Sequence, residues 1–109
     1  ISSPEIKVYC ADDKKVEVIR RTSELLKKEY PSAEVVDDER AGDGVRLDLS
    51  NGMLVVRYSQ NGPYLTIKFE AKTKERHEEL RKFLLELLHK FKEIDWTSAI
   101  NLNLNALEG

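Results

Sequence analysis

The residues best suited to chemistry lie together in one polar stretch, RYSQNGP at positions 57–63. Arg57 and Ser59 are two positions apart at the expected end of a strand, so their side chains should point to the same face of a sheet. The tip Gln60-Asn61-Gly62 can turn several backbone N–H groups inward, because Asn and Gly tolerate positive φ. An arginine fork, a hydroxyl, an amide and backbone donors together suit a phosphate. From residue types alone, a plain hairpin loop remains the better-supported interpretation, with an anion site as the alternative.

The histidines and the cysteine offer weaker signals. His77 and His89 are twelve positions apart on one expected helix, more than three turns, and neither has a carboxylate or cysteine partner at ligand spacing. We therefore interpret them as ordinary residues of the helix surface. Cys10 is on an expected core strand with no histidine nearby, which favours a small buried residue over a nucleophile.

Two further polar segments carry residue types that occur in ligand sites. The acidic run at 37–39 occurs where a strand is expected to leave the sheet, so a solvated turn is favoured over a cation site. Gly42-Asp43-Gly44 has no following helix and no Lys-Ser or Lys-Thr pair, which excludes a nucleotide phosphate loop. The lysines and arginines of both expected helices alternate with glutamates and indicate solvated faces.

Composition narrows the class of protein. A chain of 109 residues with 40% hydrophobic and 35% charged residues is expected to form one soluble domain. Its formal net charge of −2 argues against a nucleic-acid partner. Its single cysteine cannot close an intrachain disulfide, so a reducing compartment, the cytoplasm, is expected. The sequence contains neither a run of about 18 apolar residues nor a signal-like start, so no membrane partner is expected.

The first half of the chain predicts a strand, a helix and a second strand. Residues 6–10 are short, apolar and β-branched. Asp12 or Asp13 is expected to cap a helix that ends before Pro31. Its apolar face is expected to carry Val16, Ile19, Leu26 and Tyr30. A second strand is expected at residues 33–37.

The middle of the chain predicts an antiparallel hairpin followed by a further strand. Apolar and polar residues alternate over 45–49 and 53–58, and Asn51-Gly52 between them predicts a two-residue type I′ turn. Residues 65–71 alternate in the same way, so one face of each strand should be buried.

A second helix is expected after Thr73, which is a suitable N-cap. Its apolar stripe consists of Leu80, Phe83, Leu84, Leu87, Leu88 and Phe91. The order β-α-β-β-β-β-α predicts a two-layer α+β domain, with a mainly antiparallel sheet of four to five strands covered on one face by two helices.

Residues 94–109 are less informative: the alternation from Ile100 to Leu104 allows a strand, but Asn is poor in strands. A disordered tail, or residues added in cloning at 107–109, stays an open expectation.

The segment DGVRLDLSNGMLVVRYSQNGPYLTIKFEA, residues 43–71, resembles the C-terminal domain of the α-D-phosphohexomutases, the phosphoglucomutase/phosphomannomutase family. Members of that family show an Asp-Gly that opens a strand, a hairpin, an Arg-x-Ser-(Gly/Asn)-Thr-x-Pro loop and a strand that ends in Glu-Ala before a helix. The resemblance covers roughly residues 5–92. It implies a TBP-like fold for a domain at 1–93, with 94–109 as a tail.

The resemblance also implies which residues hold the substrate phosphate: Arg57, Ser59, Gln60 and Asn61, with Gly62 and Pro63 shaping the loop. Three positions depart from the family pattern. Tyr58 replaces a frequent Pro, Asn61 replaces a Thr hydroxyl with an amide, and Gly62 replaces a frequent Glu. An amide can still donate to a phosphate oxygen, and the glycine removes an acid that would repel one.

Other family motifs have no counterpart here, namely the catalytic serine loop, the Asp-Gly-Asp-Gly-Asp-Arg metal loop and the Gly-Glu-x-Ser sugar loop. We therefore expect the chain, which does not begin with Met, to be the last domain of a longer enzyme. The resemblance implies a Mg²⁺-dependent isomerase of carbohydrate metabolism that moves a phosphoryl group between the 1 and 6 positions of a hexose. This chain would contact a hexose phosphate and the other domains, bind no metal, and be inactive alone.

Two other functions fit parts of the sequence. A ferredoxin-like regulatory or protein-interaction module would use the 57–63 loop only as a hairpin. An RNA-binding α+β domain is disfavoured by the net charge and by the lack of an aromatic platform on the expected sheet.

Overall fold

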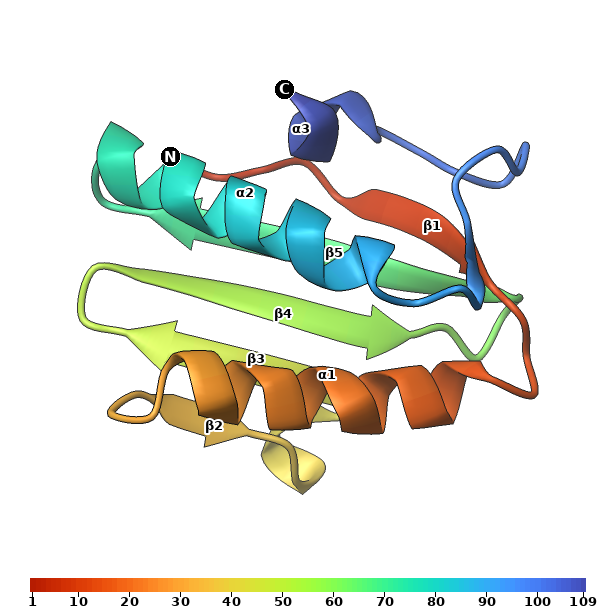
Figure 1. The fold of residues 1–109 in the computed structure, drawn as a ribbon, viewed down its shortest axis with the longest axis horizontal. Helices are drawn as coiled ribbons and strands as arrows, with labels where there is room; N and C mark the ends of the chain where they lie inside the picture. Colours follow the sequence, from red (N-terminus) through yellow and green to blue (C-terminus); the bar gives the residue numbers. More distant parts are fainter.

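A computed structural model describes residues 1–109 and places two long helices on one face of an antiparallel sheet (Figure 1). Every strand pair in the sheet is antiparallel, in the order β2-β3-β4-β5-β1-β6. The elements are β1 (Ile6–Cys10), α1 (Lys15–Glu29), β2 (Glu34–Val36), a 3₁₀ turn (Glu39–Ala41), β3 (Gly44–Leu49), β4 (Gly52–Tyr58), β5 (Tyr64–Ala71), α2 (Lys74–His89), β6 (Ile94–Asp95) and α3 (Asn105–Glu108).

The two-layer α+β class is confirmed, and its core follows from the alternation in the strands. Leu54 and Val56 of β4 are fully buried toward the helices, whereas Arg57 near the end of β4 is exposed. On α2 the predicted stripe is buried through Leu80, Leu84, Leu87 and Leu88. The sheet has six strands rather than four to five, because β6 lies in the segment 94–109.

Helix α1 differs from its prediction at its start and on its buried face. Lys14 occupies the N-cap position with no side-chain cap hydrogen bond, and Asp12 instead accepts from Lys15 Nζ at 2.8 Å. Val16 is 59% exposed, while Val18 is fully buried. The buried stripe therefore runs along Lys15, Val18, Ile19, Thr22, Ser23 and Leu26, which share the helical face toward the sheet.

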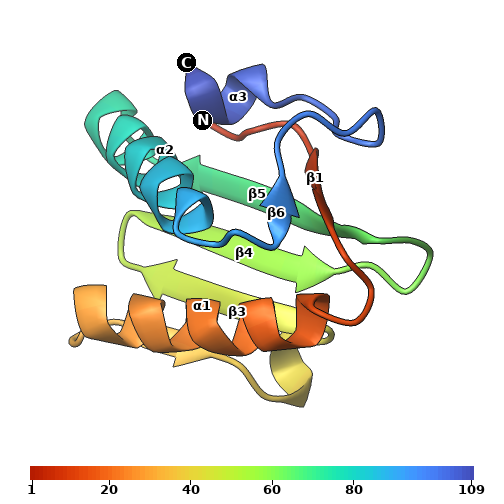
Figure 2. The ribbon, with the colours of Figure 1, turned by 45° about the vertical axis from the view of Figure 1, so that its right-hand side comes forward.

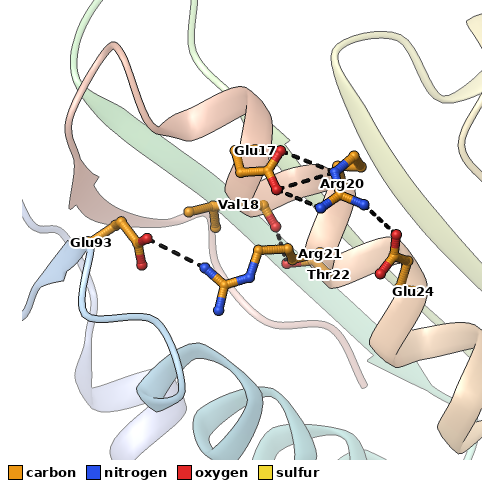
Figure 3. A network of polar contacts seen from close by, with 7 residues as sticks. All are labelled: Glu17, Val18, Arg20, Arg21, Thr22, Glu24 and Glu93. Carbon is orange, nitrogen blue, oxygen red and sulfur yellow. Dashed lines mark hydrogen bonds and ion pairs between the residues drawn. The ribbon is translucent and has the colours of Figure 1, made fainter.

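The solvent side of α1 carries ion pairs, as its charge pattern predicted. Figure 3 shows the Arg20 guanidinium between the carboxylates of Glu17 and Glu24. The hydrogen bond to Arg20 lowers the pKa of the Glu17 carboxyl. Arg21 reaches across to Glu93 at 3.3 Å, which links α1 to the segment after α2 (Figure 3).

The hairpin between β3 and β4 is present, but the predicted type I′ turn at Asn51-Gly52 is wrong. Leu49 pairs directly with Gly52, so the two turn residues are Ser50 and Asn51. Positive φ occurs only at Gly42, Asn103 and Gly109, whereas a type I′ turn needs it at both central residues. Gly52 is needed for space: a Cβ there would lie 2.9 Å from the Glu70 carbonyl oxygen.

The segment 94–109 lies along the edge of β1 that β5 leaves free, and its helix α3 packs against α2 near Arg81 (Figure 2). Ile94 pairs with Cys10, and Leu102 forms an isolated bridge with Lys7. The Asn101 side chain accepts from the Tyr9 backbone N–H at 2.7 Å. Leu107 of α3 is fully buried in the common core, so these residues have defined packing in the structure. None of the helices combines the length and apolarity that crossing a bilayer requires.

Candidate functional site

The loop at residues 59–63 joins β4 to β5 beside the connection from β1 to α1 (Figure 1). Backbone hydrogen bonds fix both of its ends. Cys10 N–H donates to the Pro63 carbonyl at 2.9 Å, and Ser59 N–H donates to the Tyr64 carbonyl at 3.0 Å. Tyr58 N–H, just before the loop, donates to the Asp43 carbonyl at 2.9 Å. The loop is therefore attached to β1 and to the turn before β3.

Arg57 lies at the end of β4 with a free guanidinium. It pairs across the sheet with Gly44 and Thr66, and it faces away from the helices because its neighbour Val56 faces the core. Its side chain forms no hydrogen bond or ion pair within the protein. All five N–H donors of this arginine are thus available to an anion. A Cβ on Gly44 would lie 2.6 Å from Arg57 Cγ, so the glycine makes room for the arginine stem.

The tip of the loop is held differently from the sequence prediction. Asn61 and Gly62 do not adopt the positive φ that their residue types allow, so the backbone of the tip differs from that expectation. Asn61 N–H instead donates to Ser59 Oγ at 2.9 Å, and Tyr64 N–H donates to the Gly62 carbonyl around Pro63, also at 2.9 Å. Two backbone donors, the N–H groups of Gln60 and Gly62, have no acceptor in the protein.

The structure brings the four predicted binding residues to one open groove of about 610 Å³. Gly62 and Pro63 do not line it. The Gln60 side chain donates to Asp43 Oδ2 at 2.9 Å, and the Asn61 side chain has no partner in the protein. Charges of both signs surround the groove, which is lined by Glu5, Lys7, Glu39, Arg40, Gly42, Asp43, Arg57, Tyr58, Ser59, Gln60, Asn61, Tyr64 and Thr66.

The sequence prediction missed Lys15, which lies beneath the loop. Its ammonium group donates to Asp12 Oδ1 at 2.8 Å, to the Ser59 carbonyl and, at 3.1 Å, to the Gly62 carbonyl. The residue is only 9% exposed. One signal was available: Lys15 is three residues before Val18, on the face of α1 that the apolar stripe buries.

The histidines are not near the groove and do not form a metal site. His77 packs on Phe69 with ring centroids 4.8 Å apart, and its Nε2 is buried without a partner. His89 stacks on Trp96 at 4.1 Å. The structure holds no group of three or more His, Cys, Asp or Glu side chains placed to bind a metal.

Cys10 is buried in the core, and the carboxylates of Asp37 and Asp38 form hydrogen bonds within the protein. Cys10 is fully buried, and burial, reinforced by the charge of Glu93, raises the pKa of its thiol to about 11. A thiol this hard to ionise is a poor nucleophile. Asp37 accepts from Lys27 and from Ser23, which together lower the pKa of its carboxyl, and Asp38 caps the 3₁₀ turn.

Comparison with known proteins identifies the family. The model for the phosphoglucomutase/phosphomannomutase C-terminal domain matches residues 5–87. A probable phosphoglucosamine mutase of Methanopyrus kandleri is 35% identical over 83 residues, which are 76% of this chain and 17% of that protein. A phosphomannomutase/phosphoglucomutase of Pseudomonas aeruginosa is 35% identical over 81 residues, 74% of this chain and 16% of its own length.

The fold has a counterpart among solved structures. The chain superimposes on a phosphoglucomutase/phosphomannomutase family protein from Burkholderia thailandensis with a TM-score of 0.61 and 22% identity, over 83% of this chain and 17% of that one. The chain thus spans about a sixth of the length of each of these relatives. On the family match and the relatives together, this chain belongs to the phosphoglucomutase/phosphomannomutase family as a C-terminal domain.

Proposed function

We propose that this chain is the substrate-phosphate-binding domain of a cytoplasmic phosphohexomutase that interconverts a hexose 1-phosphate and a hexose 6-phosphate. The relatives are named a probable phosphoglucosamine mutase and a phosphomannomutase/phosphoglucomutase, which supports a hexose phosphate as the ligand. The catalytic serine and the Mg²⁺ ligands belong to other domains of the parent enzyme. The work of this domain is to hold the phosphate that does not react.

The observation that carries this proposal is the free guanidinium of Arg57 on a groove that Ser59, Gln60 and Asn61 also line. An arginine fork makes charge-assisted, bidentate hydrogen bonds to phosphate. The unpaired N–H of Gln60, the Ser59 hydroxyl proton and the Asn61 side-chain amide supply further donors at the same groove. Binding a remote phosphate allows its binding energy to orient the reacting groups elsewhere in the enzyme.

The departures from the family loop are compatible with this role. Asn61 has an amide where relatives often carry a hydroxyl, and this amide has no competing partner in the protein. Gly62 places no carboxylate at the tip. Asp43 and Glu39 nevertheless leave negative charge on the groove, so Arg57 is the residue on which affinity should depend most.

The test is a titration of the chain followed by amide chemical shifts. Inorganic phosphate or a hexose 6-phosphate at millimolar concentration is expected to shift the amides of residues 57–66, with little change in α1 and α2. Arg57→Ala should lower the affinity at least tenfold. Lys68→Ala is the matched control, because Lys68 is an exposed cation two residues from Thr66 on the same sheet face but outside the groove.

The proposal fails if wild-type protein shows no loop-localised shifts, or if Arg57→Ala binds as wild type does. Either result would favour the alternative of a regulatory or protein-interaction module in which the loop only joins two strands.

A further inference from the structure

Lys15 is held by a complete set of hydrogen bonds beneath the loop. Its side chain is 11% exposed, and its ammonium has three donors. One donor is used by the carboxylate of Asp12 and the other two by the carbonyls of Ser59 and Gly62. A buried ammonium is stable only when it is paired and hydrogen-bonded, so these contacts fix the lysine and the two carbonyls together. None of its donors is left for a ligand.

The contact with Ser59 sets the direction of a neighbouring donor. The C=O of residue 59 and the N–H of Gln60 belong to one peptide plane, and in a trans peptide they point in opposite directions. No peptide bond in the chain is cis. Since the Ser59 carbonyl points at Lys15, the Gln60 N–H points away from Lys15. This N–H has no acceptor in the protein, and its residue lines the groove.

We propose that Lys15 is a positioning residue that turns the peptide between Ser59 and Gln60 so that its N–H, and not its C=O, is presented to an anion. The inference rests on the proposed phosphate site and adds a residue of another element to it. Without the ammonium, the Ser59 carbonyl loses its buried donor and has to seek water. Rotation of that peptide would bring an acceptor oxygen toward the groove, where it repels a phosphate. The contact with Gly62 fixes the far side of the tip in the same way, although Pro63 has no N–H to present.

The first test needs no ligand. Lys15→Met removes the charge and the donors but keeps a long unbranched side chain. Its amide shifts relative to wild type should be concentrated at residues 59–62, with the largest at Gln60, and the Ser59 amide should exchange with deuterium at least tenfold faster. Lys14→Met is the matched control, because Lys14 is the exposed neighbour and forms no side-chain hydrogen bond. An unchanged loop in Lys15→Met would overturn the proposal.

The second test measures phosphate binding. Lys15→Met should weaken the affinity for inorganic phosphate about fivefold to tenfold, and phosphate should no longer shift the Gln60 amide. Because salt screens a simple charge effect, the loss should persist in 0.5 M salt, where the Debye length is roughly 4 Å. A loss equal to that in Lys14→Met, or one that disappears in salt, would show that Lys15 contributes only its charge and would overturn the positioning role.

Failure of the phosphate site and failure of the role of Lys15 give different results in these tests. If wild-type protein binds no phosphate, the proposed function fails, while the ligand-free comparison still decides whether Lys15 orients the loop. If Lys15→Met does not fold, Lys15→Gln retains two donors on a shorter side chain. Its amide shifts relative to wild type should then be concentrated at the same loop residues but be smaller than those expected for Lys15→Met. If the Gln60 amide shifted no more than the amides of the core, the inference would be overturned.

Discussion

Gln60 donates its side-chain amide to the carboxylate of Asp43 at 2.9 Å, across the groove that Arg57 also lines. Asp43 accepts from Tyr58 N–H through its backbone as well, so this one residue ties the β4–β5 loop to the turn before β3. The contact has two opposing consequences for an anion. It orders the loop, and it places a negative charge beside the arginine.

Asp43→Asn should therefore tighten phosphate binding. The asparagine oxygen can still accept from Gln60, while the repulsive charge is gone. For charges about 8 Å apart in water the Coulomb energy is roughly 0.5 kcal/mol, which corresponds to about a twofold to threefold change in the dissociation constant. Phosphate titrations at low and high salt measure it, and the gain should shrink in high salt.

The control for Asp43→Asn is Asp13→Asn, which removes the same charge from an exposed residue that does not line the groove. Equal gains in both variants would mean that only net charge matters. If Asp43→Asn bound phosphate more weakly, the hydrogen bond by which the Asp43 carboxylate orders the loop would matter more for affinity than its repulsion of the phosphate.

Cys10 should make the protein less stable at high pH. Burial, together with the charge of Glu93, raises the pKa of the thiol from 9.0 to about 11 in the folded state. Below pH 9 the thiol is neutral in both states, so it contributes no pH dependence there. Between pH 9 and 11 the unfolded thiol ionises and the folded one does not, so the free energy of unfolding falls by on the order of 2 kcal/mol.

Denaturant unfolding of wild type and Cys10→Ala across pH 8–11 isolates this effect from the lysines and tyrosines, which both proteins share. Wild type should be the more stable protein at pH 8, because alanine leaves a cavity. Its advantage should decrease as the pH rises. Parallel curves for the two proteins would contradict the buried, neutral thiol.

The sheet and the position of the loop could be predicted because they depend on local patterns. Period-two alternation over β3, β4 and β5 indicates that one face of each strand is buried, and the structure places Arg57 on the opposite, exposed face. The resemblance named the same four residues that the structure brings to one groove. Whether they bind phosphate stays a prediction.

What could not be predicted depends on contacts that are distant in sequence. The spacing of Lys15 to Val18 indicates only that the lysine lies on the buried face of α1. The two carbonyls that satisfy its ammonium are 44 and 47 residues away, and no local pattern identifies them. The Asn51-Gly52 pair predicts a type I′ turn that the structure does not contain, because glycine can meet two different structural needs. Gly52 is required because a Cβ would collide with the carbonyl of Glu70 on β5. The Asn-Gly dipeptide alone does not distinguish this need for space from a need for positive φ.

Gly44 and Gly42 provide a direct comparison of those two uses of glycine. A Cβ on Gly44 would lie 2.2 Å from the Val56 carbonyl oxygen, so Gly44→Ala should force β3 and β4 apart and cost about 3 kcal/mol or more. Gly42 has φ of 68° and ψ of −132° with open space around it, so Gly42→Ala should cost on the order of 1–3 kcal/mol, the penalty of a backbone conformation that residues other than glycine rarely adopt. Thermal and denaturant unfolding measure both, and a larger loss in Gly42→Ala would contradict this ranking.

Leu107 tests whether residues 94–109 are an integral part of the domain. The side chain is fully buried in the same core as the sheet, and Arg81 of α2 donates to the Leu107 carbonyl at 2.5 Å. Leu107→Ala should lower the free energy of unfolding by about 2–4 kcal/mol, because it removes buried methyl groups and leaves a cavity. Leu102→Ala, at a residue that is 44% exposed in the same segment, should change it by about 0.5 kcal/mol or less. Equal small losses in the two variants would mean that the core closes without α3, and the domain would then end near α2.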